Sequence, residues 1–225
     1  MTTSAEGSGP AGLFIVLEGP DGAGKSVQAR RLAERLRERG LRVTWTREPG
    51  GTPLGEQVRQ ILLDPADVAR GPVADALLFN AARSQLVADV ILPALRRGEV
   101  VVLDRYATST LAYQGYGSGV DRETLALIAR LATAGLQPDV VVVLDVPVEV
   151  GLARRDLGHA EELTRFEDAS RHDIAFHQRV RDGYLEMAAA DPERWVVIDG
   201  SRDVDAVAED VSRAVDAVVE RRSHA

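Results

Sequence analysis

Residues 19–26 of the chain read Gly-Pro-Asp-Gly-Ala-Gly-Lys-Ser. They match the pattern G-x-x-x-x-G-K-[ST] at every fixed position, and in this pattern backbone N–H groups surround phosphate oxygens. The run at 13–17 before it is apolar, as in a buried parallel strand. The run at 27–39 after it has helical periodicity and is followed by Gly40. The pattern therefore lies between a predicted strand and a predicted helix, which is the context that a phosphate-binding loop requires.

The residue types in this loop fit the phosphates of a nucleotide. Gly19, Gly22 and Gly24 let the backbone come close to an anion. Lys25 is placed to reach the outer phosphates, and the Ser26 hydroxyl is placed to hold Mg²⁺. Of the 27 lysine and arginine residues in the chain, Lys25 is the only lysine. A glycine-rich turn that matches by chance is the alternative, and the flanking strand and helix disfavour it.

Length and composition indicate a globular protein. A chain of 225 residues with 45% hydrophobic and 28% charged residues fits one α/β domain, and no apolar run is long enough to span a bilayer. The polar start predicts a disordered extension at 1–12 before a domain at 13–225. The absence of cysteine excludes a disulfide framework and fits the cytoplasm. A net charge of −8 argues against general nucleic-acid binding, and we expect no membrane partner.

Five short hydrophobic runs alternate with helical segments, at 13–17, 43–46, 100–103, 140–144 and 195–198. Their near-continuous valine and leucine predicts strands that are buried on both faces. The sequence thus predicts an α/β fold of the P-loop NTPase type, with three layers and a five-stranded parallel sheet flanked by helices. Functional side chains are then expected just beyond the carboxyl ends of the strands.

Two segments after the third predicted strand carry candidate site residues. Asp104 directly follows the strand and is the expected second ligand of Mg²⁺, and Arg105 can bind phosphate oxygens with its two-pronged guanidinium group. Polar side chains then recur at spacings of four and form two helical stripes: Ser109, Thr110, Tyr113 and Gln114. Glycines at 115, 117 and 119 are expected to end this helix in a flexible loop.

Three other segments each allow two interpretations. The run Arg47-Glu48-Pro49-Gly50-Gly51-Thr52 is either a turn or an anion site at a strand end. Phe79 and Arg83 share one face of a helix predicted at 77–95, which is expected to kink or stop near Pro93. They are either a core phenylalanine beside a solvated arginine, which the spacing alone favours, or a pair of site residues. The charged stretch at 148–163 is either a surface loop or a lid that brings arginines over the phosphates: Arg154, Arg155 and Arg165.

From residue 14 to about residue 200 the chain resembles the bacterial thymidylate kinases. The resemblance rests on four motifs in order, namely residues 14–19 (FIVLEG), 47–52 (REPGGT), 78–83 (LFNAAR) and 104–106 (DRY). It implies a cytoplasmic, homodimeric enzyme that uses MgATP to convert dTMP to dTDP and so supplies dTTP for DNA synthesis. It also implies a lid at about 151–167.

The resemblance implies a role for each site residue. ATP would lie on residues of the phosphate loop: Gly19, Pro20, Asp21, Gly22, Ala23, Gly24, Lys25, Ser26 and Val27. Phe79 would stack on thymine and Arg83 would hydrogen-bond its edge, with Tyr113 beneath the sugar near C2′. The other dTMP-binding residues would contact the phosphate, the sugar or the base: Asp21, Arg47, Pro49, Arg105, Ser109, Thr110 and Gln114.

The family places the arginine that stabilises the transferred phosphoryl group either in the phosphate loop or in the lid. Here the loop position is Gly22, so the lid arginines Arg154, Arg155 and Arg165 are expected to act, together with Lys25, Arg105 and Asp21 as catalytic residues. Residues 165–167 resemble the Asp-Arg-x-Glu lid segment, with Thr164 in place of its aspartate. Two alternatives stay open: a kinase of another (deoxy)pyrimidine monophosphate, and a P-loop nucleotide-binding protein that is not a kinase.

Overall fold

The described part of the chain, residues 12–63, 70–157 and 173–223 of a computed structural model, contains a five-stranded parallel sheet. Its strands are β1 (Leu13–Glu18), β2 (Val43–Arg47), β3 (Val100–Asp104), β4 (Val140–Asp145) and β5 (Trp195–Asp199), in the order β2-β3-β1-β4-β5. Neighbouring strands are parallel, with Leu13 opposite Val100 and Ile15 opposite Val140. All five predicted strands are confirmed, and each extends one residue beyond its predicted end.

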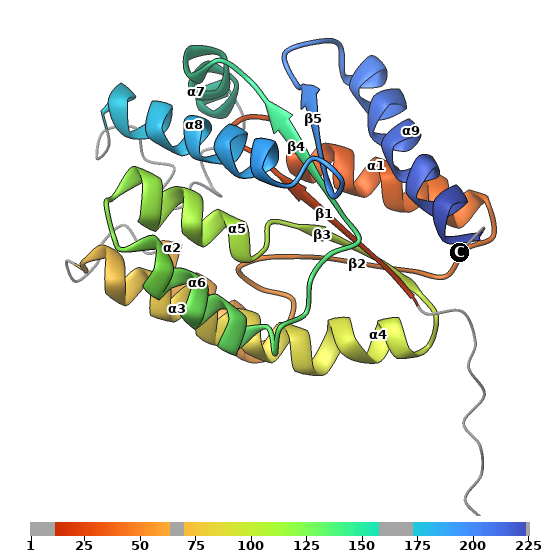
Figure 1. Cartoon of the computed structure of the whole chain (residues 1–225), viewed down its shortest axis with the longest axis horizontal. Coiled ribbons are helices and arrows are strands. Elements are labelled where there is room, and N and C mark those ends of the chain that lie inside the picture. Colours follow the sequence, from red (N-terminus) through yellow and green to blue (C-terminus); the bar gives the residue numbers. More distant parts are fainter. Residues whose placement is uncertain (1–11, 64–69, 158–172, 224–225) are drawn as a thin grey trace, which may run out of the picture.

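The two faces of the sheet are covered by different helices (Figure 1). On one face, α1 (Lys25–Glu38) and α9 (Val204–Ser223) pack against alternate strand residues such as Ile15 and Val142. On the other face, strand residues such as Val16 and Val101 pack against α3 (Pro72–Leu86), α4 (Leu92–Arg96) and α8 (Ile174–Ala190) and the segments that join them. The predicted three-layer α/β architecture is therefore confirmed.

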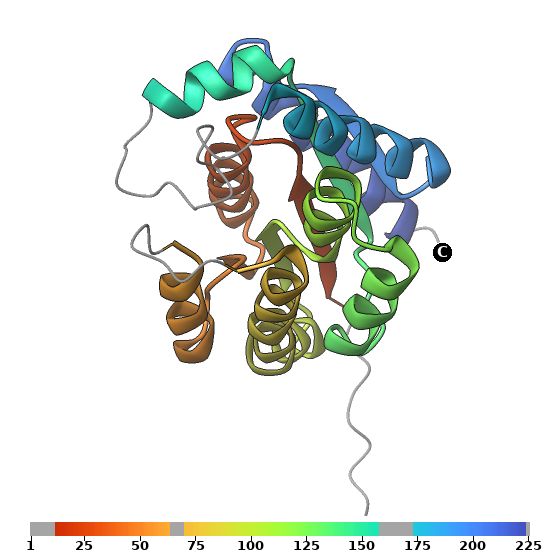
Figure 2. The ribbon, with the colours of Figure 1, turned by 90° about the vertical axis from the view of Figure 1, so that its left-hand side faces the viewer.

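Each of the remaining α-helices packs against α3 or α8. They are α2 (Pro53–Leu63), α5 (Ala107–Thr110), α6 (Arg122–Ala132) and α7 (Val148–Leu157). Figure 2 shows α2 and α3 next to each other, with α7 at the opposite side of the molecule. The outer strands β2 and β5 are only partly buried, with Trp45 37% exposed and Val197 45% exposed, because each has one neighbouring strand instead of two.

Two π-helical segments distinguish the structure from the prediction. The helix predicted at 77–95 runs from residue 72 to 96 as α3, the π-helical segment η1 (Val87–Ile91) and α4. The wider turn of η1 ends two residues before Pro93. Because proline has no N–H group to donate to the preceding turn, this wider turn lets the helix continue past Pro93. The second segment, η2 (Leu111–Gly117), continues α5.

The flexible loop expected at Gly115 and Gly117 is wrong. Both glycines belong to η2 and are buried, and only Gly119 follows the helix. A Cβ atom at Gly117 would lie 2.6 Å from the Phe176 ring, so this glycine lets η2 pack closely against α8. Their function is close helix packing, which the sequence motif of alternating glycines does not distinguish from a loop.

Two predicted segments fall partly outside the described residues. The predicted extension at 1–12 lies there except for Gly12, and the predicted lid at 151–167 lies there beyond residue 157. Residues 151–157 form the end of α7. Within the described ranges, the structure contains no helix that is both long and apolar enough to cross a membrane.

Candidate active site

A cavity of about 600 Å³ opens at the carboxyl ends of the strands. Its walls come from the phosphate loop, the ends of β2 and β3, the helices α2, α3, α5 and α7, the segment η2 and the start of α9. The predicted site residues that line it are Asp21, Gly22, Ala23, Gly24, Lys25, Ser26, Val27, Arg47, Pro49, Phe79, Asp104, Arg105, Ser109, Thr110, Tyr113, Gln114 and Arg154. The structure thus brings most of the predicted residues to one cavity.

The phosphate loop has the backbone conformation that its glycines allow. Gly19, Gly22 and Gly24 have φ angles of 137°, 70° and 89°, in the region that disfavours residues with a Cβ atom. The first residue of α1 is Lys25, and no side chain caps this helix end. The Lys25 ammonium donates a hydrogen bond to the Pro20 carbonyl oxygen at 2.7 Å. Unlike the rest of the loop, Gly19 and Pro20 lie behind the cavity wall.

Gly22 lies directly against α7. A Cβ atom at Gly22 would lie 1.9 Å from the carbonyl oxygen of Gly151, and a Cβ atom at Gly151 would lie 2.4 Å from that of Asp21. Any side chain at position 22 would force these backbones apart. An arginine is therefore excluded from this loop position in the described arrangement.

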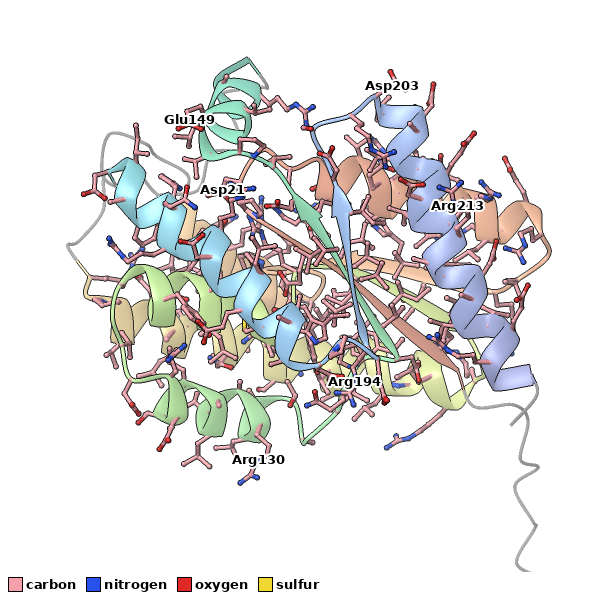
Figure 3. All side chains as sticks on the ribbon, turned by 45° about the horizontal axis from the view of Figure 1, so that its top comes forward. Asp21, Arg130, Glu149, Arg194, Asp203 and Arg213 are labelled. Atoms are coloured by element: carbon pink, nitrogen blue, oxygen red, sulfur yellow. The ribbon has the colours of Figure 1, made fainter. Side chains whose placement is uncertain are left out.

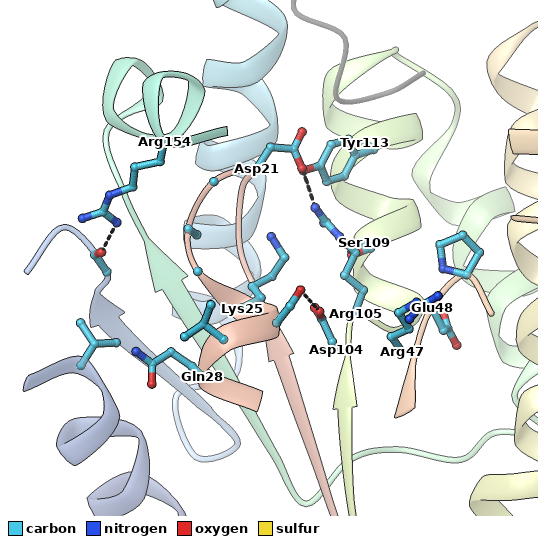
Figure 4. A pocket seen from close by; sticks show the side chains of 18 of the residues that line it. Asp21, Lys25, Gln28, Arg47, Glu48, Asp104, Arg105, Ser109, Tyr113 and Arg154 are labelled. Atoms are coloured by element: carbon cyan, nitrogen blue, oxygen red, sulfur yellow. Dashed lines mark hydrogen bonds and ion pairs between the residues drawn. The ribbon is translucent and has the colours of Figure 1, made fainter. Parts of the chain in front are cut away.

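Ser26 and Asp104 form a pair of oxygen ligands next to the phosphate loop. The Ser26 hydroxyl donates a hydrogen bond to Oδ2 of Asp104 (Figure 4), while the buried Oδ1 of Asp104 has no hydrogen-bond partner among the residues that the structure describes. Among the described residues there is no group of three or more histidine, cysteine or acidic side chains that could form a metal cage. One carboxylate and one hydroxyl suit Mg²⁺ that is held mainly by nucleotide phosphates and water. The residues therefore fit this ion.

Asp21 lies at the centre of a second cluster on the cavity wall. Its Oδ1 accepts hydrogen bonds from Nη2 of Arg105 and from the Tyr113 hydroxyl, each at 2.5 Å. Burial raises the pKa of Asp21, but the charges of Arg105 and Lys25 outweigh burial and hold this pKa below its ordinary value. Figure 3 shows Asp21 among interior side chains, whereas Arg213 projects from α9. Asp21 is thus an ionised carboxylate that fixes the guanidinium of Arg105.

Arg105 has an unusual backbone conformation, with a φ angle of 67°. This left-handed conformation is uncommon for a residue with a side chain and is found mainly where the surrounding structure enforces it. The Arg105 guanidinium also lies 5.1 Å from the centroid of the Tyr113 ring. Together these contacts hold one arginine in a defined position at the junction between the phosphate loop and η2.

Arg83 does not line the cavity, although Phe79 one turn earlier does. The Arg83 side chain is 1% exposed, and all three of its guanidinium nitrogens contact protein atoms. Nε donates to Oε2 of Glu48 at 2.8 Å, and Nη1 donates to Asn80 at 2.9 Å and to Thr110 at 3.1 Å. Arg83 is therefore a buried ion-pair partner that lies directly behind Thr110 on the cavity wall.

Glu48 is the residue that sequence reasoning missed on this side. It lines the cavity, its carboxylate is paired with Arg83, and its buried Oε1 has no hydrogen-bond partner in the described part of the chain. Burial raises the pKa of Glu48 to about 7, although the charge and the hydrogen bond of Arg83 oppose that rise. Its position after β2 in the motif at 47–52 was the available signal, because strand ends supply site residues in such folds.

The opposite end of the cavity is formed by the predicted Arg154 and by residues after β5 and at the start of α9 that belong to no sequence motif. Arg154 of α7 donates hydrogen bonds to the carbonyl oxygens of Gly200 at 2.6 Å and Ser201 at 2.9 Å, which lie after β5 (Figure 4). The unpredicted residues of this end are Gln28, Gly200, Arg202, Val204 and Val207. Arg59 of α2 is a further unpredicted residue of the cavity, but it lies beside Pro49 at the other end. The Arg155 side chain and the whole of Arg165 lie outside the described part of the structure.

A parallel sheet with a phosphate loop and an adjoining hydroxyl–carboxylate pair, both on the wall of one cavity, is typical of a P-loop nucleotide-binding protein. The thymidylate kinase family model matches residues 17–211. The chain belongs to this family.

Individual relatives agree with the family model. The chain is 51% identical over 199 residues to the thymidylate kinase of Geobacter sp. strain M21, which covers 86% of both proteins. It is 47% identical over 211 residues to that of Pseudomonas putida strain GB-1, covering 94% of this chain and 98% of the relative. The crystal structure of thymidylate kinase from Ehrlichia chaffeensis superposes with a TM-score of 0.73 at 32% identity, over 92% of this chain and 99% of the other.

Proposed function

We propose that this cavity transfers the γ-phosphoryl group of ATP to dTMP, giving dTDP and ADP. An oxygen of the dTMP phosphate attacks the γ-phosphorus in line, and the bond from that phosphorus to the bridging oxygen of ADP breaks. The observation that carries the proposal is that the phosphate loop and the side chains Phe79, Thr110 and Gln114 line one cavity. Family membership supports the same reaction.

We assign the ATP phosphates to the loop at 19–27. Its glycine backbone and the start of α1 supply N–H donors to phosphate oxygens, and Lys25 supplies a positive charge at the outer phosphates. Ser26 and Asp104 would hold Mg²⁺, in part through water. When bound, the ion neutralises charge on the β- and γ-phosphate oxygens. The attacking phosphate oxygen is already deprotonated at neutral pH, so positioning and charge supply the catalysis rather than a strong base.

We assign dTMP to the side of the cavity formed by α3, α5 and η2. Arg47 and Arg105 bind its phosphate, with Asp21 holding Arg105. Phe79 stacks on the base, and Arg83 positions Thr110 at the base edge through its hydrogen bond to the Thr110 hydroxyl. The remaining dTMP contacts come from Pro49, Ser109, Tyr113 and Gln114, all of which line the cavity.

We assign stabilisation of the transferred phosphoryl group to an arginine of the lid at about 151–167: Arg154, Arg155 or Arg165. The contact between Gly22 and Gly151 supports a lid arginine, because it leaves no room for an arginine in the loop. Such an arginine is worth about 10³–10⁵ in rate. Arginine-to-methionine variants at the three positions test this by kcat, and the assignment fails if none loses more than about tenfold.

The reaction is tested by ADP release from MgATP with a panel of acceptors: dTMP, dUMP, dCMP, dGMP and UMP. We expect strong turnover with dTMP and weaker turnover with dUMP, since one methyl group is worth about 10–200-fold. Preference for another pyrimidine would keep the chemistry and overturn the base assignments. ATP hydrolysis that needs no acceptor would favour a P-loop protein that is not a kinase.

The sugar assignment is tested by Tyr113→Ala. We expect this variant to narrow the ratio between kcat/KM for dTMP and that for the matching ribonucleotide, because the ring would crowd a 2′-hydroxyl group. Since Tyr113 also donates to Asp21, Tyr113→Phe is the control that keeps the ring and removes only the hydroxyl. An unchanged ratio in Tyr113→Ala would refute the assignment.

We also propose that the enzyme is a cytoplasmic homodimer with one kinase domain at 13–225. Exposed apolar side chains on α3 and α6 support self-association, with Leu77 52%, Leu127 60% and Leu131 83% exposed. Sedimentation of the wild type and of Leu127→Glu/Leu131→Glu tests the dimer. We expect a dimer and a monomer respectively, and a monomeric wild type would overturn it.

A further inference from the structure

Glu18 is a buried carboxylate to which none of the roles above applies. It is the last residue of β1, directly before Gly19 of the phosphate loop, and its side chain is 0% exposed. A polar group at such a depth requires hydrogen-bond partners around it. The position of Glu18 at the end of β1 does not by itself explain why a carboxyl group is buried there.

The hydrogen-bond donors to Glu18 belong to the start of α5 and to α8, next to the proposed dTMP pocket. Its Oε1 accepts hydrogen bonds from the Tyr106 N–H at 2.9 Å, the Thr108 hydroxyl at 2.6 Å and the Ser109 N–H at 3.2 Å. Its Oε2 accepts from the Ser109 hydroxyl at 2.7 Å and the Tyr184 hydroxyl at 2.9 Å. Five hydrogen bonds thus join one side chain of β1 to the start of α5 and to α8.

The segment held in this way carries the acceptor-binding side chains. The first turn of α5 continues into η2, and together they present Ser109, Thr110, Tyr113 and Gln114 to the cavity. Arg105 lies immediately before this turn, and its own N–H donates to the Leu17 carbonyl oxygen at 3.0 Å. The strand that ends in the phosphate loop is thereby tied to the helix that lines the acceptor pocket.

We propose that Glu18 is a positioning residue that fixes the acceptor pocket relative to the phosphate loop. In-line transfer needs the attacking oxygen and the phosphorus close to contact, and a displacement of about 1 Å can cost about 10²-fold in rate. Glu18 limits that displacement because its backbone leads directly into the phosphate loop, while its carboxyl group accepts hydrogen bonds from the segment that lines the proposed dTMP pocket. ATP binds to the phosphate loop, so its affinity depends little on Glu18.

The test uses Glu18→Gln and measures phosphoryl transfer in a single turnover, together with the dissociation constants of ATP and dTMP. The amide keeps the shape and one acceptor oxygen but replaces the other oxygen by a donor. We expect the transfer rate to fall at least tenfold while the dissociation constant of ATP changes less than threefold. A loss of ATP affinity in proportion to the rate, or an unchanged rate, would overturn the proposal.

A matched pair of tyrosines provides a second test with little risk to folding. Tyr184→Phe removes one donor to Glu18, and Tyr116→Phe removes the hydroxyl that donates to the exposed Glu186 at 2.8 Å. We expect the transfer rate to fall about fivefold in Tyr184→Phe and to change less than twofold in Tyr116→Phe. Equal effects would overturn the proposal.

This inference rests on the acceptor site proposed above, and the two can fail separately. If the acceptor site is wrong, the wild type prefers a substrate other than dTMP in the acceptor panel. If only the role of Glu18 is wrong, dTMP remains the preferred acceptor and Glu18→Gln transfers the phosphoryl group at the wild-type rate.

Discussion

The two sides of the cavity are built from different parts of the chain. The donor side is one continuous loop of residues whose backbone supplies the phosphate contacts, and its conformation depends on glycines at 19, 22 and 24. The acceptor side is assembled from buried polar and charged side chains of β1, the end of β2, α3 and α5, such as the pair of Glu48 and Arg83. The donor side therefore follows from local sequence, while the acceptor side depends on the packing of distant segments.

The comparison predicts that removing a charge on the acceptor side destabilises the whole protein. Arg83→Met leaves Glu48 buried without its partner, and breaking a buried ion pair from one side costs about 3–5 kcal/mol. Urea unfolding measures this free energy. Arg122→Met is the control, since Arg122 pairs with Glu186 on the surface with its side chain 52% exposed, and such pairs contribute about 0–1 kcal/mol. Similar losses of unfolding free energy in both variants would contradict this difference between the buried and the surface ion pair.

On the donor side, removing a charge should affect catalysis and leave the fold stable. Lys25→Met keeps the length of the side chain and removes its charge, and we expect kcat to fall about 10²–10³-fold, as for the loss of one preorganised transition-state contact. The free energy of unfolding should change by less than about 1 kcal/mol, because the loop conformation depends on its glycines. Steady-state kinetics and urea unfolding of the same preparation decide this, and a destabilisation as large as that of Arg83→Met would refute it.

The buried carboxylate of Glu48 should make stability depend on pH. Its pKa of about 7 lies above its ordinary value of 4.5, so between these pH values the folded protein holds a proton that the unfolded chain has released. The free energy of unfolding should therefore fall as pH rises through this window, by about 3 kcal/mol in total. In Glu48→Gln this part of the slope should be absent. Urea unfolding at pH 5 and pH 8 compares the two proteins, and parallel slopes would contradict the prediction.

The smallest expected effect concerns the packing behind the acceptor side. Gly117→Ala would place a Cβ atom 2.6 Å from the Phe176 ring and 2.9 Å from Val180, and overpacking of this kind costs about 1–3 kcal/mol. Gly71→Ala is the control, because a Cβ atom there would meet nothing within 4 Å. Thermal unfolding should separate the two variants. Equal melting temperatures would mean that η2 and α8 can move apart at little cost.

Much of the site could be predicted because its residues follow strands. The phosphate loop, Asp104 and Arg105 each come directly after a run of buried apolar residues, and parallel strands bring their carboxyl ends to one edge. The spacing of four between Ser109 and Tyr113 predicted a shared helix face, and both residues line the cavity. Family resemblance supplied the substrate, which strand positions do not specify.

Local sequence patterns account for the order and type of the main elements and for the phosphate loop. These depend on apolar runs, helical periodicity and glycines, all of which act over a few neighbouring residues. The structure alone decided the partners of the buried carboxylates: Glu18 meets Tyr184, 166 positions away, and Glu48 meets Arg83, 35 positions away. It also decided that Gly117 packs within a helix. Such pairings arise only when separate segments fold against one another, because burial makes an unpaired charge costly and so selects a partner from any part of the chain.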